Sequence, residues 1–164
     1  MNTEVEDVLA ALREIPDPEM PIGIVDLGIV ERVHIESENG RRIARITLLP
    51  TFVGCPALDM IRDQVTECVR AMEGIDDAEV AFVFDPPWSI DRISDAGRDS
   101  LAAHGVTVPA AGGPVAVTLS TSAVPCPFCA SNATRLDSPF GPTRCRAIHY
   151  CEACKNTFEQ MKRV

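Results

Sequence analysis

The 164-residue sequence predicts an α+β fold, a small sandwich of helix, strand, strand, helix and strand, followed by a C-terminal zinc ribbon. Hydrophobic residues alternate between helical and strand spacing in that order through the first half of the chain. Two Cys-x2-Cys pairs lie near the C-terminus. Charge divides the chain in the same way, because residues 1–125 hold 21 acidic and 9 basic side chains whereas residues 126–164 hold 3 and 6.

A short amphipathic helix is predicted near the N-terminus. Thr3-Glu4-Val5-Glu6 has the spacing of a capping box, in which the hydroxyl and the carboxylate satisfy free amides at a helix start. Apolar residues then recur at helical spacing to about Glu14. The three prolines in residues 16–21 end this helix and predict an extended segment, because a residue that precedes proline avoids helical backbone angles.

The next elements follow from the spacing of apolar residues. Residues 28–36 and 43–49 are predicted strands, and Asn39-Gly40 between them is a signal for a hairpin turn. Residues 56–72 place apolar and cysteine side chains on one helical face, and residues 78–84 form a third, largely buried strand. This order is typical of a sheet with helices on one face.

A last helix and a linker complete the organisation. Ser94 is a good N-cap for a further helix, and Gly105 is a good terminator. A stretch rich in proline and glycine follows, which is typical of a linker. We therefore expect an α/β domain of residues 1–107, a linker of residues 108–117 and a metal-binding ribbon of residues 118–164.

Composition excludes several classes of protein. No apolar run reaches the length that spans a membrane, and the acidic N-terminal residues do not resemble a signal peptide. A net charge of −9 argues against general affinity for nucleic acid or for an anionic membrane. Seven cysteines, an odd number, do not indicate a disulfide framework. We expect a soluble cytoplasmic protein whose cysteines bind metal or perform thiol chemistry.

The strongest chemical signal is a set of four cysteines. Cys126-x2-Cys129 is followed, after 21 intervening residues, by Cys151-x2-Cys154. Two such turns can close a tetrahedron of thiolates around zinc. A tail this short cannot bury enough surface to fold alone, so the metal would supply folding free energy on the order of 10 kcal/mol. Iron or an iron–sulfur cluster could occupy the same four thiolates.

Two other interpretations of the tail are open. Cys126-Pro127-Phe128-Cys129 alone also matches the dithiol of a thiol oxidoreductase, although it lacks a βαβ context and a second pair lies nearby. Cys145 and His149 lie between the two pairs. Packing inside the ribbon is the simpler interpretation of both residues, and the alternative is that Cys145 is an additional metal ligand.

Cys55 stands immediately before the second predicted helix. If Pro56 is the first helical residue, the helix dipole and the free amides favour the thiolate form of Cys55. Cys68 falls on the apolar face of that helix and is predicted to be a core residue. No histidine shares a local motif with Cys55, so nucleophilic catalysis lacks its usual partner. Turn and cap roles are sufficient to explain Asp17 and Glu19.

Several segments resemble known families. DPEMPIGIVDLGIV at residues 17–30, the Thr51-x3-Cys55-Pro56 motif and Asp85-Pro86-Pro87-Trp88 resemble the metal–sulfur cluster assembly domain family, over about residues 3–107. Residues 126–162 resemble the ribbon tail of the phenylacetate-degradation D family. Members of that family are encoded with the multicomponent phenylacetyl-CoA 1,2-epoxidase, a di-iron oxygenase fed by a reductase that carries flavin and a 2Fe–2S cluster.

The resemblance implies roles for individual residues. Cys55 would be the thiol that handles iron or a cluster, and Thr51 and Asp26 would shape its surroundings. The metal ligands of the ribbon would be Cys126, Cys129, Cys151 and Cys154, with Cys145 beside them. The tail departs from the family at Asn156-Thr157, where Glu-Pro is usual. We expect this departure to matter little, because neither position is a ligand.

The resemblance also implies a non-enzymatic accessory factor that helps to assemble or insert iron or an iron–sulfur cluster in the epoxidase system. Its partners would be the oxygenase component, the reductase component or both. A single thiolate binds a cluster poorly, so a homodimer, a partner ligand or help from the ribbon cysteines is expected. The alternative is a structural interaction component of the epoxidase complex that does not transfer metal.

Overall fold

The computed structural model describes residues 4–110 and 123–163, and the chain divides into two compact units, Met1–Trp88 and Ser89–Val164. Residues 89–107 therefore pack within the second unit. The expected domains of residues 1–107 and 118–164 stay a prediction, and most of the expected linker, residues 111–117, lies outside the described residues. No helix in the described part of the chain is long and apolar enough to cross a membrane.

The first unit contains a three-stranded sheet of order β1-β2-β3. β1 (Val30–Glu38) pairs antiparallel with β2 (Arg41–Leu48), and β2 pairs parallel with β3 (Asp77–Phe82). Asn39 and Gly40 both have positive φ, at 50° and 79°, as a two-residue hairpin of type I′ requires. The hairpin prediction is therefore confirmed.

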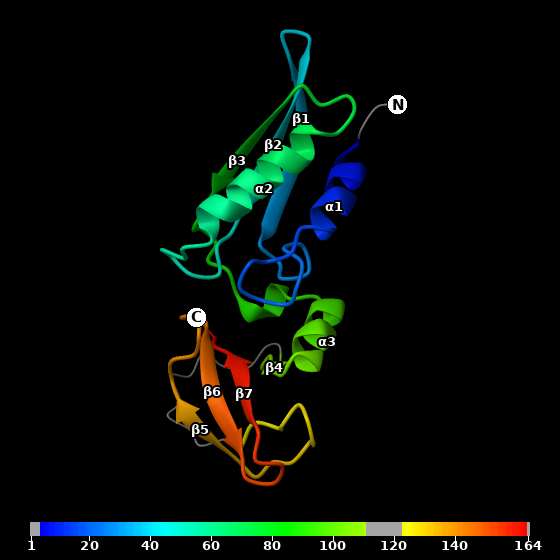
Figure 1. Cartoon of the computed structure of the whole chain (residues 1–164). Helices are drawn as coiled ribbons and strands as arrows, with labels where there is room; N and C mark the ends of the chain where they lie inside the picture. Colours follow the sequence, from blue (N-terminus) through cyan, green and yellow to red (C-terminus); the bar gives the residue numbers. More distant parts are fainter. Residues whose placement is uncertain (1–3, 111–122, 164) are drawn as a thin grey trace. The chain divides into compact units, whose positions relative to one another are not determined.

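Helices α1 (Val5–Arg13) and α2 (Leu58–Arg70) complete this unit. α2 contacts β3 and lies across the sheet, and α1 contacts both α2 and β1 (Figure 1). The two helices and the central strand bury alternate or helically spaced apolar side chains against one another: Val8, Leu12, Ile61, Val65 and Val69 from the helices, and Ala44, Ile46 and Leu48 from β2. The predicted order of elements is confirmed.

Two local predictions in the N-terminal region need correction. The cap of α1 is Glu4, whose capping box is closed by Asp7 rather than Glu6, and Thr3 lies outside the described residues. Residues 18–22 form bends and residues 24–28 form turns rather than an extended segment. An isolated bridge between Pro16 and Gly23 closes the proline-rich part of this loop, because Ile24 donates its amide to the carbonyl of Ile15 at 3.0 Å.

The second unit contains a short helix, a 3-10 turn and a four-stranded sheet of order β4-β7-β6-β5. The elements are η1 (Ile90–Arg92), α3 (Asp95–Ala103), β4 (Val106–Thr107), β5 (Thr134–Ser138), β6 (Arg146–Cys151) and β7 (Thr157–Met161). Ser94 caps α3 by accepting the amide of Gly97 at 3.0 Å, and Gly105 follows its end with φ of 77°. Both terminus predictions are therefore confirmed.

Candidate functional sites

The four ribbon cysteines come from two turns with the same hydrogen-bond pattern. In the first turn the carbonyl of Cys126 accepts the amide of Ala130 at 2.9 Å, and Cys126 donates its own amide to Ser131 at 2.9 Å. In the second turn Cys151 accepts from Lys155 and donates to Asn156, again at 2.9 Å. Each turn requires a residue with left-handed backbone angles four positions after its first cysteine. These residues are Ala130, with φ of 58°, and Lys155, with φ of 63°.

These two turns bring all four sulfurs within 4.8 Å of one another. The Sγ atoms of Cys126 and Cys154 are 3.7 Å apart, and those of Cys129 and Cys151 are 3.6 Å apart. Metal–sulfur bonds of about 2.3 Å in a tetrahedron give sulfur–sulfur distances of about 3.8 Å. The four thiols therefore fit a single tetrahedral metal ion of the kind that prefers soft ligands.

The turns favour negative charge at one of the sulfurs. The backbone amide of Asn156 is the largest influence that lowers the pKa of Cys154 to about 6, and burial opposes it. The side-chain amide of Asn156, 3.5 Å from this sulfur, and the thiols of Cys151 and Cys126 lower the pKa further. Asn156 is not a ligand, but its side chain contacts a ligand sulfur, so the expectation that its identity matters little stays a prediction.

The pKa of Cys129 is raised, whereas that of Cys154 is lowered. The backbone amide of Ser131 by itself lowers the pKa of Cys129, but burial and hydrogen bonds with the three other sulfurs outweigh this influence and raise the pKa to about 12. A reactive dithiol needs one thiol that ionises readily, within the Cys-x2-Cys pair that does the chemistry. Here the sulfurs of Cys126 and Cys129 each lie within 3.7 Å of a sulfur of the other turn, which favours metal binding over the oxidoreductase interpretation.

The apolar core beneath this metal centre is small. Among the described residues it consists of Cys126, Cys151 and Phe158, with Val124 and Cys154 packed against it. Three of these five residues, Cys126, Cys151 and Cys154, are candidate ligands, so the apolar contacts and the ligands of this cluster are largely the same residues. This cluster by itself buries little surface, so we expect a bound metal to contribute to the stability of the ribbon.

Cys145 and His149 lie outside the group of four sulfurs. Cys145 is buried, its sulfur lies 3.1 Å from the hydroxyl of Thr143, and its carbonyl accepts the amide of Lys162. His149 is buried on β6 and stacks on Phe158 with ring centroids 5.4 Å apart. Burial lowers the pKa of His149, so it packs as a neutral ring.

A second thiol site lies in the first unit. The half-buried sulfur of Cys55 lies 3.8 Å from Oε2 of Glu19, a residue 36 positions away in the sequence. Glu19 is positioned by the turn around Asp17, because the amide of Glu19 donates to Oδ1 of Asp17 at 2.9 Å. The sequence indicated only turn and cap roles for these two acids. The carboxylate at the thiol was missed because no local pattern links residues so far apart.

The start of α2 differs from the prediction. Ala57 is its N-cap and Leu58 its first residue, so Cys55 is three residues before the helix. A separate turn, in which Leu58 donates its amide to the carbonyl of Cys55 at 3.3 Å, precedes the helix. Because the helix dipole acts mainly within the first turn, it favours a Cys55 thiolate less than predicted.

The other two residues predicted near Cys55 have separate positions. Thr51 is half-buried in the loop that leads from β2 to Cys55. Asp26 forms an ion pair with Arg13, with 3.6 Å between Oδ1 and Nη1. Their influence on Cys55 stays a prediction. Cys68 is partly buried on α2, and burial raises the pKa of its thiol, as expected for a packing residue.

Two family models match the chain. One is described as an iron–sulfur cluster assembly protein and matches residues 5–82, and the other is described as the PaaD zinc beta ribbon domain and matches residues 110–162. The fold and the two thiol sites thus define a class of protein in which a cluster-assembly domain is followed by a four-cysteine ribbon. Solved structures support the first half. A DUF59 domain from Bacillus anthracis is 33% identical with a TM-score of 0.53 and covers 58% of this chain and 89% of its own.

Curated relatives identify the particular family. The D component of the "Putative 1,2-phenylacetyl-CoA epoxidase" of Escherichia coli K12 is 34% identical over 160 residues, which cover 97% of this chain and 93% of that protein. The chain therefore belongs to the family of phenylacetyl-CoA epoxidase D proteins.

Shorter relatives match the first half alone: the Fe-S protein maturation auxiliary factor YitW of Bacillus subtilis is 34% identical and covers 54% of this chain and 84% of its own. SufT of Staphylococcus aureus, also named an Fe-S protein maturation auxiliary factor, is 37% identical and covers 48% of this chain and 85% of its own.

Proposed function

We propose that this protein is a cytoplasmic accessory factor that helps to assemble or insert iron or an iron–sulfur cluster in the multicomponent phenylacetyl-CoA epoxidase. The name of its full-length relative supports the client, and the names of its shorter relatives support the activity. The protein is not the catalyst in this proposal. It acts on the oxygenase component, the reductase component or both.

The contact between Cys55 and Glu19 carries the proposal. A thiolate and a carboxylate are both ligands of iron, and here they come from two separate loops of the assembly-type domain. A cluster is normally held by four protein ligands, so this pair leaves positions for ligands from a client or from a second copy of the chain. Incomplete ligation suits a carrier, because the client can complete the coordination shell and remove the cargo.

The ribbon has a different role in this proposal. Cys126, Cys129, Cys151 and Cys154 hold one zinc ion as a structural centre, because four thiolates in a closed tetrahedron leave no open position for a substrate. The zinc supplies the folding free energy that the small ribbon core lacks. The folded ribbon then offers a surface to the epoxidase.

The test uses matched cysteine variants in cells that lack the protein. Cys55→Ser should abolish most epoxidase activity and lower the iron and acid-labile sulfide recovered with the purified epoxidase components. Cys68→Ser is the control, because Cys68 is a half-buried thiol of the same unit that packs on α2. Full restoration of activity and cluster content by Cys55→Ser would show that this thiol handles no cargo.

A second candidate function is an interaction component that binds the epoxidase without transferring metal. Val53, Met60 and Phe84 favour it, because these large apolar side chains of the first unit are 68%, 52% and 52% exposed. A contiguous apolar patch is typical of a protein-binding surface, and this function requires the three side chains to act as one patch. This function predicts that Cys55→Ser restores activity fully whereas Cys151→Ser, which breaks the ribbon centre, does not.

A further inference from the structure

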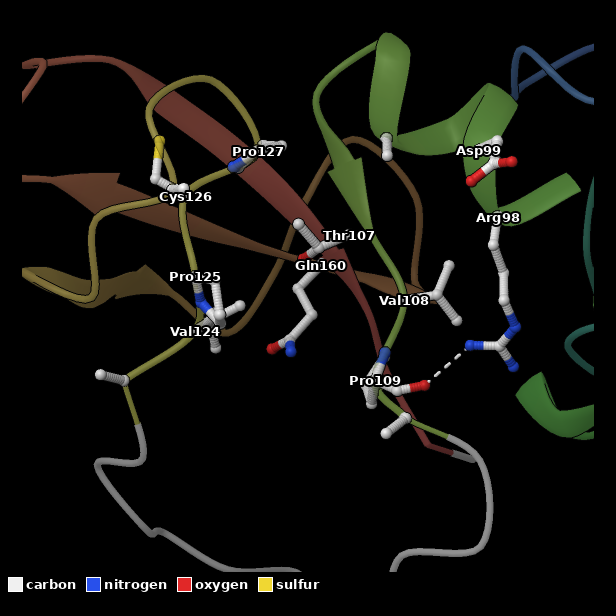
Figure 2. A pocket seen from close by; sticks show the side chains of 14 residues that line it. Arg98, Asp99, Thr107, Val108, Pro109, Val124, Pro125, Cys126, Pro127 and Gln160 are labelled. Carbon is white, nitrogen blue, oxygen red and sulfur yellow. Dashed lines mark hydrogen bonds between the residues drawn. The ribbon is translucent and has the colours of Figure 1, made fainter. Parts of the chain in front are cut away.

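A pocket of about 640 Å³ lies within the second unit, between the α3–β4 segment and the first cysteine turn (Figure 2). One wall comes from α3 and the residues that follow β4, and the opposite wall comes from residues 123–127. Its volume lies in the range of sites that bind small organic molecules, about 300–1,000 Å³. Cys55 is not among its described lining residues, and Cys126 is the one ribbon cysteine that is.

Most of the lining is apolar. The walls consist mainly of the side chains of Val108, Pro109, Val124, Pro125 and Pro127. Gln160 of β7 extends its amide into the space between Val124 and Pro109 (Figure 2). Such a pocket favours a ligand with an apolar body and few polar atoms, because each desolvated polar group needs a partner.

Arg98 is the basic side chain among the lining residues. Its guanidinium is half-buried and donates to three main-chain carbonyls, those of Ile90 at 2.7 Å, Pro109 at 2.9 Å and Ile93 at 3.4 Å. A guanidinium has five N–H donors, so two remain, one on each terminal nitrogen. Both can serve an acceptor with two oxygens.

The charge of Arg98 is not neutralised by a carboxylate in the part of the chain that the structure describes. The three carbonyl groups accept from three of its donors but carry no net charge. The neighbouring residue Asp99 also lines the pocket, but its carboxylate points away from the guanidinium (Figure 2). A half-buried cation beside an apolar space is a strong recognition element for an anion, because the low dielectric constant strengthens their attraction.

We propose that this pocket binds a small organic carboxylate with an apolar body. The carboxylate pairs with the two remaining N–H groups of Arg98, the apolar body lies against the valine and proline walls, and Gln160 provides a neutral polar contact. A phosphate fits less well, because its second charge would lack a partner. The nearby Arg163 is already paired with Asp91 at 3.4 Å.

The test is a titration of the full-length, metal-loaded, ¹⁵N-labelled protein with phenylacetate and octanoate, an aryl and an alkyl carboxylate. The neutral analogues phenylacetamide and octanamide are titrated in parallel. We expect saturable shifts of the Gln160 side-chain amide and the Arg98 Nε signal. At least one acid should bind about tenfold or more tightly than its amide, since hydrogen bonds to a charged group contribute about 1.5–3 kcal/mol.

Two variants test separately how the charge of Arg98 and the volume of the pocket contribute to ligand affinity. Arg98→Gln removes the charge but leaves a neutral polar side chain, and it should reduce the affinity for the acid to that of the amide. Val124→Phe fills the space and should abolish binding of both. Arg135→Gln is the control, because this exposed ribbon arginine is paired with Asp137 and Glu152 and should leave the affinity unchanged.

The proposal is overturned by equal affinity for acid and amide, by no saturable shift up to about 10 mM of either acid, or by unchanged binding in a folded Val124→Phe protein. Folding of each variant is checked by its amide spectrum and its metal content. None of these results bears on the cargo role of Cys55, because the complementation test with Cys55→Ser needs no carboxylate binding.

Discussion

The two compact units are stabilised in different ways. Among the described residues, the first unit buries 19 hydrophobic side chains, whereas the second buries ten, of which three are cysteines. The first unit therefore has a conventional apolar core between its helices and sheet. In the second unit two of the four ligand cysteines, Cys126 and Cys151, belong to the buried cluster of the ribbon, so a metal is expected to hold its two turns together. One chain thus combines an element stabilised by burial with one stabilised by coordination.

The two thiol sites also differ, because one is a closed group of four sulfurs and the other is incomplete. The ribbon repeats one rigid turn twice and arranges four thiols in a closed group. Cys55 lies in an irregular loop and has one carboxylate beside it. A closed site retains its ion and an incomplete site can exchange it. This contrast supports separate structural and transfer roles for the two sites.

Removal of the metal is expected to produce the largest difference between the two units. Chelation, or Cys151→Ser, should unfold the ribbon, at a loss on the order of 10 kcal/mol of folding free energy. The first unit should stay folded. Trp88 is the single tryptophan, is 3% exposed and donates its indole N–H to the carbonyl of Leu27 at 3.0 Å, so its fluorescence reports on the packing of that unit.

The measurement compares amide signals of β6 and β7 with Trp88 emission during chelation. Ribbon signals should collapse while the emission maximum stays constant, and added zinc should restore them. A red shift of Trp88 emission in step with ribbon unfolding would show that the two units share one source of stability.

A substitution that creates a cavity in the first unit tests whether the stability of this unit depends on its apolar core. Leu48→Ala, on the central strand β2, should lower the free energy of unfolding of this unit by about 2–5 kcal/mol, because the side chain is fully buried. Urea unfolding monitored by Trp88 gives the value. Metal content should remain at one ion per chain. Val53→Ala, at a 68% exposed position, is the control and should change stability little.

Asn156→Ala sharpens the account of the ribbon. Loss of the side-chain amide beside Cys154 should weaken metal binding by about 10- to 100-fold, as is typical of groups that contact a ligand. Competition with a chromophoric chelator measures the affinity. Asn132→Ala, an exposed amide after the first cysteine turn, serves as the control. Equal metal affinities of the Asn156→Ala and Asn132→Ala proteins would show that Asn156 influences the metal site through its backbone amide and not through its side chain.

The smallest effect concerns acid stability of the first unit. The Arg70 side chain, followed by the backbone amide of Ala78, holds the pKa of Asp77 below its usual value. A lowered folded pKa adds stability above the unfolded pKa of about 3.9, and this stability is lost as pH falls through the folded value. Asp77→Asn should therefore be slightly less stable than the native protein at pH 7, and the difference should vanish in acid. A constant difference across this range would exclude the carboxylate as its cause.

Local signals account for what the sequence predicted correctly. The Asn39-Gly40 turn, the Ser94 cap and the paired cysteines each act over a few residues, and the structure contains all three. The start of α2 was placed too early because Pro56 is compatible with either a helix or the turn before it. Such alternatives are decided by packing rather than by local preference.

Long-range contacts account for what the sequence did not predict. Glu19 meets Cys55 only because the loop after α1 folds back through the Pro16–Gly23 bridge. The role of Asn156 depends on the direction of its side chain within a turn, which spacing does not encode. Neither position has a pattern of its own, so each becomes visible only when both partners are placed in space.

The pairing of β4 with β7 has a consequence for dissecting the protein. The ribbon family match begins at residue 110, yet Val106 and Thr107 pair with Glu159 and Gln160 and complete the sheet. A fragment cut at residue 110 would expose the edge of β7, and an open strand edge invites association with other chains. Expression trials of the isolated ribbon should therefore begin at Ser89, where the compact unit begins, to keep the fragment monomeric in solution.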